Sequence, residues 1–143
     1  MTVRLKAEVE TKGPIFKHSA ITVTERAITS ALREIVQEGE SFMFQKFRPR
    51  PQGVYLATPP AQGGSTGHYR RSISSKVERT RAEINDGGVV YGPWLEGLSS
   101  RNSANGFEGY AVFRKASQHL QKKARGILDR HASRLTRKLG GRG

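Results

Sequence analysis

Residues 109–139 read GYAVFRKASQHLQKKARGILDRHASRLTRKL, and this stretch decides the fold. Its apolar residues recur mostly at intervals of three and four, as on one face of a helix. They are Tyr110, Phe113, Ala116, Leu120, Ala124, Ile127, Leu128, Leu135 and Leu139. The pattern predicts a long amphipathic helix that ends near Gly140 and Gly141.

The other positions make this helix strongly basic. Residues 109–143 hold 10 Lys or Arg and one acidic residue, Asp129, whereas residues 1–108 hold 15 basic and 11 acidic side chains. The whole chain has 143 residues and a formal net charge of +13. A charge of this sign and size favours polyanions or acidic protein surfaces as partners.

A second helical pattern lies in the first third of the chain. Its apolar positions are Ala27, Ile28, Ala31, Leu32, Ile35, Val36, Phe42 and Met43. Thr22 and Glu25 have the spacing of a capping box, so we expect the helix to begin there. Pro49 disfavours helical geometry in the residue before it and predicts a helix end between Lys46 and Arg48.

The segment between the two helices changes from a helical period to a period of two. Residues 49–67 are rich in proline and glycine and predict a long flexible loop. Residues 72–79 and 80–84 predict strands, Asp86-Gly87-Gly88 predicts a hairpin turn, and residues 89–91 predict the returning strand.

The N-terminus predicts one further strand. Val3, Leu5, Ala7 and Val9 alternate with charged residues, so one face of this strand should be buried and the other exposed. Together the elements predict one α+β domain spanning residues 1–143, in which a small antiparallel sheet packs with two long helices.

Residues suited to catalysis or metal binding are few. The chain has no cysteine, which excludes thiolate metal sites and cysteine nucleophiles. His68, Ser72 and Asp86 could be written as a catalytic triad, but a triad is defined by its geometry. His119 and His131 are too far apart for an i, i+4 metal pair. We therefore expect no enzyme activity, no cofactor and no metal, and the absence of a long apolar run predicts no membrane partner.

The basic helix leaves two interpretations open. Its cations could neutralise DNA phosphates, or they could be the solvated side of a helix whose other side belongs to the core. Tyr110 and Phe113 fall on the apolar side, so no aromatic platform for stacking bases is expected. Sequence-specific recognition of nucleic acid is therefore not predicted.

Two stretches resemble a known family. Residues 66–73, TGHYRRSI, resemble the T-G-x-L-x-x-S-I element of the small neck or tail-completion proteins of siphophages. Residues 91–97, YGPWLEG, are similar to the Y-A-x-x-L-E-x-G-T element of that family, and residues 113–116, FRKA, to its P-F-L-x-x-A element before the last helix. The order of elements matches over residues 20–138, although Tyr69 replaces a leucine and residues 102–109 lack the usual proline.

The resemblance implies a structural protein of the phage head-tail neck, in the tail-completion or tail-terminator region. Such a protein would form a homo-oligomeric ring, with six copies favoured over twelve, through which genomic DNA passes. Its other partners would be the neighbouring head-completion and tail proteins. It would be assembled in the cytoplasm of the bacterial host and reside in the virion, and the family has no catalytic residues.

For this ring we expect two groups of contact residues. Subunit contacts are expected at a strand end, residues 91–96, and near the polar loop that follows it at residues 99–106. For Trp94 and Leu95 a place in the core remains the alternative. Contacts with neighbouring proteins are expected on the basic helix, facing away from the lumen, because phosphate contacts would hold the moving DNA. The first group is Tyr91, Trp94, Leu95, Glu96 and Phe107, and the second is Arg130, Arg134, Arg137 and Lys138. The alternative function is a nucleic-acid-binding protein that uses the basic C-terminal helix.

Overall fold

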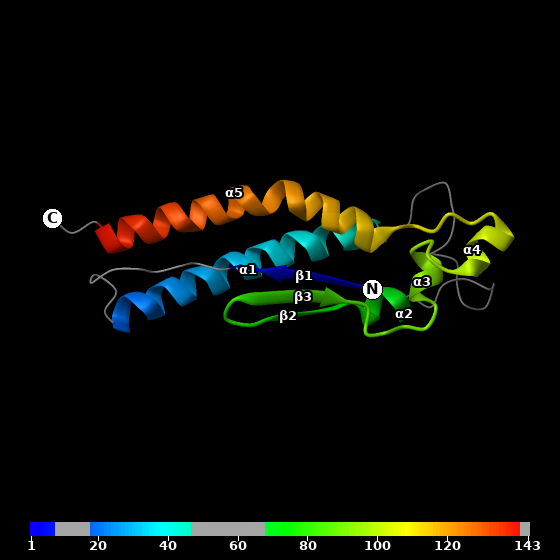
Figure 1. The fold of residues 1–143 in the computed structure, drawn as a ribbon, viewed down its shortest axis with the longest axis horizontal. Coiled ribbons are helices and arrows are strands. Elements are labelled where there is room, and N and C mark those ends of the chain that lie inside the picture. Colours follow the sequence, from blue (N-terminus) through cyan, green and yellow to red (C-terminus); the bar gives the residue numbers. More distant parts are fainter. Residues whose placement is uncertain (8–17, 47–67, 141–143) are drawn as a thin grey trace.

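The structure is a computed structural model and describes residues 1–7, 18–46 and 68–140. The loop expected at residues 49–67 and the end of the first expected strand, at Val9, lie outside the described residues. The α+β class predicted from the sequence is confirmed (Figure 1). In chain order the elements are β1 (Thr2–Lys6), α1 (His18–Lys46), α2 (His68–Ser72), β2 (Ser74–Val77), β3 (Arg81–Asn85), α3 (Gly92–Leu95), α4 (Ser100–Asn105) and α5 (Val112–Gly140).

The two long helices, α1 and α5, lie side by side and run in opposite directions (Figure 1). Each has 29 residues, which at about 1.5 Å per residue gives a length of about 43 Å. Their apolar sides meet in one buried cluster, and polar pairs such as His119 with Glu38, 2.6 Å apart, link the helices along the edge. The helix predicted at residues 109–139 is thus confirmed with small shifts at both ends.

The three strands form an antiparallel sheet in the order β1-β3-β2. Val3 pairs with Ile84 and Leu5 with Ala82, so the apolar side chains of β1 and β3 share one face. The opposite face is polar and carries the ion pair between Arg4 and Glu83, 3.3 Å apart. The predicted alternation of the N-terminal strand is confirmed over residues 2–6.

The apolar face of the sheet packs against α1, and β1 also contacts α5. Gly39 of α1 lies between β3 and α5. A Cβ atom at this position would lie 2.8 Å from Cδ1 of Ile84 in β3 and 2.9 Å from Cδ1 of Leu120 in α5. Both neighbours are fully buried, so the close approach of sheet and helices depends on the absence of a side chain here.

The hairpin turn lies between β2 and β3, at residues 78–80, whereas the sequence predicted it at residues 86–88. β2 and β3 pair with each other, and the Glu78 N–H donates to the Arg81 carbonyl oxygen at 2.7 Å to close the turn between them. The predicted returning strand at residues 89–91 is wrong. The side chains of Asn85 and Asp86 accept hydrogen bonds from the N–H groups of Gly87 and Gly88, and this turn leads the chain out of the sheet toward α3.

Two further boundaries differ from the prediction. α1 begins at His18, so Thr22 lies inside the helix and is not its cap. Thr24 in the same turn donates its hydroxyl to the Ala20 carbonyl oxygen, a bond typical of a helix interior. The expected polar loop at residues 99–106 contains α4, because Ser99 and Asn102 form a capping box that starts a helix there.

The packing at Gly39 predicts opposite effects for the same substitution at two helical glycines. Gly126 of α5 is exposed, and a Cβ there would meet only the end of Arg130 at 4.0 Å. Gly126→Ala should raise the free energy of unfolding by about 0.5–1 kcal/mol, the usual gain in helix propensity. Gly39→Ala should lower it by up to about 2 kcal/mol, because overpacking outweighs that gain. Urea denaturation followed by circular dichroism measures both, and equal stabilisation by the two variants would contradict the packing described.

Candidate functional site

The candidate site is the corner formed by residues 89–110, where α3 and α4 precede the start of α5 (Figure 1). α3 is a single helical turn that begins with Gly92 and Pro93, and the Gly92 N–H donates to the Val89 carbonyl oxygen at 2.8 Å. Proline suits the first turn of a helix because its missing N–H would have no partner there. A side chain at Gly92 would collide with the buried carboxylate of Asp86, 2.3 Å from the Cβ position. The sequence Gly-Pro therefore turns the chain tightly against the end of the sheet.

The carboxylate of Glu96 holds the start of α5. Its two oxygens accept hydrogen bonds from the Phe113 N–H, at 3.1 and 3.2 Å, and one of them lies 3.5 Å from the Arg114 nitrogen. The residue before the helix is Ala111, whose methyl group can accept no hydrogen bond and whose φ of 51° is left-handed. Glu96 thus takes the place of an N-cap side chain, and its negative charge is favourable at this end of the helix dipole.

Two glycines bring Glu96 to this position. Gly97 and Gly109 have φ angles of 81° and 78°, and a Cβ on Gly97 would lie 2.1 Å from the Glu108 carbonyl oxygen. The Tyr110 N–H donates to the Leu95 carbonyl oxygen at 2.6 Å across the same crossing. The two segments therefore pass each other at backbone contact distance, which side chains would prevent.

A buried amide completes the corner. The Asn102 side chain donates to the carbonyl oxygens of Trp94 and Phe107, both at 2.8 Å, and accepts from the Ser99 N–H at 2.9 Å. One side chain therefore ties α3, the start of α4 and the segment after α4 together. The signal in the sequence was Ser99-x-x-Asn102, a capping-box spacing, which was interpreted as a polar loop.

The outer side of the corner is aromatic and apolar. The Trp94 and Phe107 rings lie 4.7 Å apart, and the Phe107 and Tyr110 rings lie 5.2 Å apart with an edge-to-face tilt. Three apolar or aromatic side chains are exposed there and line one surface pocket, and Val90 is 95% exposed. We name these three the α3 surface: Val90, Tyr91 and Trp94. Arg101 borders the same pocket.

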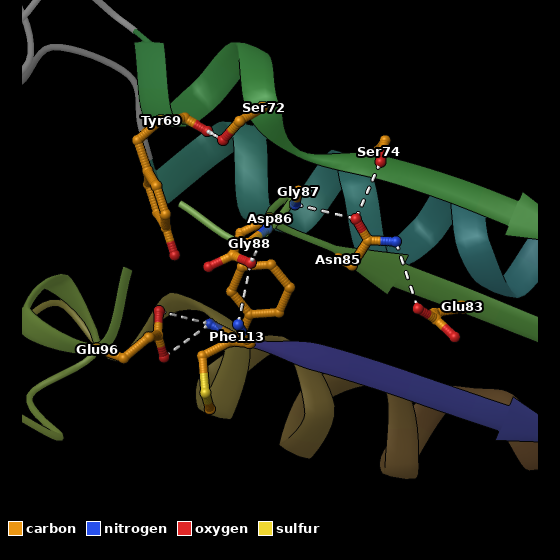
Figure 2. Close-up of polar contacts among 11 residues, drawn as sticks. Tyr69, Ser72, Ser74, Glu83, Asn85, Asp86, Gly87, Gly88, Glu96 and Phe113 are labelled. Carbon is orange, nitrogen blue, oxygen red and sulfur yellow. Dashed lines mark hydrogen bonds and ion pairs between the residues drawn. The ribbon is translucent and has the colours of Figure 1, made fainter. Parts of the chain in front are cut away.

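A buried polar cluster lies at the end of the sheet (Figure 2). Asp86 is 2% exposed, and its Oδ1 lies 3.0 Å from the Met1 amino group and accepts from the Gly88 N–H. Oδ2 of Asp86 has no hydrogen-bond partner among the described residues. Burial raises the pKa of Tyr69 above its ordinary range, and the nearby carboxylates of Glu96 and Asp86 add to this shift. The phenol therefore stays neutral between two buried acids.

The structure separates the five expected subunit-contact residues into two groups. Tyr91 and Trp94 are exposed, and Phe107 is partly buried beneath Trp94. Leu95 packs against the core and Glu96 is 2% exposed, so these two side chains serve the subunit itself. The expectation of Glu96 at a subunit contact is corrected, because both of its oxygens are used at the start of α5.

The residues considered for catalysis make other contacts. The Ser72 hydroxyl donates to the Tyr69 carbonyl oxygen, and the ring of His68 faces that of Tyr91 with 6.4 Å between centroids. His119 and His131 bind separate glutamates of α1, Glu38 and Glu34. Within residues 1–7, 18–46 and 68–140, no cluster of three or more potential metal ligands occurs. No helix in the described part of the chain has an apolar stretch long enough to cross a membrane.

The expected partner contacts lie on the last turns of α5, at the end of the molecule opposite α3 (Figure 1). Arg130 reaches Glu34 of α1 at 2.5 Å, and His131 binds the other oxygen of the same carboxylate at 2.8 Å. These bonds hold the pKa of Glu34 below its ordinary value, with the His131 bond the larger cause. Arg134, Arg137 and Lys138 are exposed.

Comparison with models of protein families, with curated proteins and with solved structures finds no match to this chain.

The role of Glu96 predicts a graded loss of stability. Glu96→Ala removes the acceptor of a buried N–H and leaves a cavity, and it should lower the free energy of unfolding by about 2–3 kcal/mol. Glu96→Gln keeps one acceptor oxygen and should cost about half as much. Glu108 is an exposed glutamate on the crossing segment, and Glu108→Ala should change the free energy of unfolding by less than about 0.5 kcal/mol. Thermal and urea denaturation measure the series, and a Glu96→Ala variant as stable as Glu108→Ala would refute the capping role.

Proposed function

We propose that this protein is a structural subunit of a phage head-tail neck, in the tail-completion or tail-terminator region. One observation carries the proposal: the stretch that resembles the family, residues 91–97, builds a corner held by buried hydrogen bonds, and the outer side of this corner exposes the α3 surface. The corner is fixed from within by Glu96, Gly97 and Asn102. A surface held so firmly in an exposed position is suited to contact with another protein.

The composition of the α3 surface favours a subunit contact. Tryptophan and tyrosine are enriched at the centres of protein interfaces, where they bury large areas at a small entropy cost. The side chain of Val90 is almost completely exposed, so it contributes no burial to the stability of an isolated subunit. In a closed ring each subunit contributes two different surfaces, and the α3 surface would be one of them. Six copies are favoured over twelve by the resemblance alone.

The charges of α5 fit a second task in the same assembly. The described part of α5 carries nine Lys or Arg and one acidic residue, Asp129. We infer that Arg134, Arg137 and Lys138 meet acidic surfaces of neighbouring head-completion or tail proteins, since cations lining the lumen would hold the passing DNA. The chain would then reside in the virion.

A second candidate function is nucleic-acid binding through α5. The observation that favours it is the same excess of exposed cations, because sequence-independent binding needs only phosphate contacts. The two functions differ in which surface is essential: the α3 surface for the ring, and α5 for nucleic acid.

The ring predicts that assembly depends on Val90. Val90→Glu changes a side chain with almost no contacts, so the fold should be unaffected while the dissociation constant of the oligomer rises about tenfold or more. Trp94→Ala should act in the same direction. Native mass spectrometry and light scattering measure the oligomer, and the wild-type chain should reach six times the mass of one subunit.

The matched control is Leu128→Glu, which places the same charge on a 37% exposed apolar residue of α5. This variant should assemble like the wild type. A wild-type chain that stays monomeric up to its solubility limit, or equal dissociation of the Val90 and Leu128 variants, would contradict the ring.

The salt dependence of DNA binding tests the second candidate. A neck subunit should bind a labelled duplex weakly, with affinity lost near physiological salt, because binding that rests on phosphate contacts alone falls steeply as salt rises. Fluorescence anisotropy over a series of salt concentrations gives the number of phosphates contacted. Tight binding that persists at physiological salt would favour the nucleic-acid function over the ring.

A further inference from the structure

The end of the helix pair opposite the α3 surface contains a cationic groove. A pocket of about 380 Å³ lies between the first turns of α1 and the last turns of α5. We name it the α1–α5 groove, and its lining residues are Val23, Arg26, Ala27 and Ser30 of α1 and His131, Arg134, Leu135 and Lys138 of α5.

The positive charges in this groove come from both helices. They are Arg26, Arg134 and Lys138, and no carboxylate among the described residues lies within ion-pair distance of them. Glu34 is the nearby acid on α1, and both its oxygens are already bound by Arg130 and His131. Like charges that share a pocket repel each other, so an anion placed there relieves a cost that the isolated chain carries.

The base of the groove is apolar and incompletely filled. Val23 and Ala27 of α1 and Leu135 of α5 are only partly buried, and the last residue of α5 that is fully buried is Ile127. Thus about the last three turns of α5 add no fully buried residue to the core. Exposed Leu139, 41% accessible, continues the apolar character at this end.

We propose that the α1–α5 groove binds an acidic amphipathic segment of a partner protein. Carboxylates of that segment pair with Arg26, Arg134 and Lys138, and its apolar side chains cover Val23, Ala27 and Leu135. Charge complementarity selects an acidic occupant, and the apolar base selects a peptide over a nucleic acid. Phosphate backbones offer no apolar side chain for such a base, and the described residues that line the groove include no aromatic ring on which a nucleobase could stack. The site rests on the acidic partner proposed above for α5, and it does not depend on the α3 surface or on ring formation.

The test measures peptide binding to the full chain by fluorescence anisotropy. The probe is a labelled amphipathic peptide with Leu at helical spacing and Glu beside each Leu, and a second peptide carries Ser in place of Leu at equal charge. A labelled DNA duplex is the third probe. The groove variant is Arg134→Glu with Lys138→Glu, and the matched control is Lys122→Glu with Arg125→Glu, which makes the same charge change on exposed positions of α5 outside the groove.

The groove variant should weaken binding of the Leu peptide about tenfold or more, and the control variant should weaken it less than about threefold. The Ser peptide should bind the wild type about tenfold more weakly than the Leu peptide. Equal losses in the two variants, equal binding of the two peptides, or no binding of the Leu peptide would overturn the proposal. A loss confined to duplex binding in the groove variant would overturn it in favour of a phosphate site. The oligomeric state of the same samples reports separately on the ring.

Discussion

The bond between the Glu96 carboxylate and the start of α5 is the interaction on which the rest of the structure depends. α5 begins after Ala111, which provides no cap, so the first free N–H groups of a 29-residue helix are satisfied from 17 residues earlier in the chain. The same bond fixes the direction in which α5 leaves the corner and packs on α1. It also places Trp94, two residues before Glu96, on the outside. The direction of α5, its packing on α1 and the exposure of Trp94 thus all depend on the Glu96 carboxylate.

This arrangement gives the molecule two different ends. The α3 end exposes apolar and aromatic side chains, and the far end, where α1 begins and α5 ends, carries a cationic groove and fewer buried residues. The two ends lie at opposite extremes of the helix pair (Figure 1). Subunits of a closed ring bind head to tail through unlike surfaces, and rings that stack need further surfaces for their neighbours. A chain with an apolar end and a charged end is compatible with both requirements. In the proposed ring, the α3 surface would join the subunits, and the charges of α5 would face acidic neighbouring proteins.

The periodicity of apolar residues in the sequence was enough to predict the elements that bury one face. The apolar period of α5 and the alternation of β1 each follow from one buried face, and both predictions are confirmed. The prediction of a returning strand at residues 89–91 was wrong because the side chains of Asn85 and Asp86 accept hydrogen bonds from the following glycines and turn the chain out of the sheet. The alternation of apolar and polar residues does not reveal these bonds. The role of Glu96 depends on a contact 17 residues away, so its acidic side chain was interpreted as part of an interface. Gly97 beside it was a signal of close backbone contact that could have suggested otherwise.

Electron cryo-microscopy of the assembled oligomer tests the central claim most directly, namely that the α3 surface joins subunits in a ring around DNA. The account predicts a closed ring in which Val90 and Trp94 are buried against the next subunit. It also predicts that Arg130, Arg134, Arg137 and Lys138 lie outside the lumen. A ring whose lumen is lined by these four cations, or an oligomer in which Val90 and Trp94 remain in solvent, would contradict it.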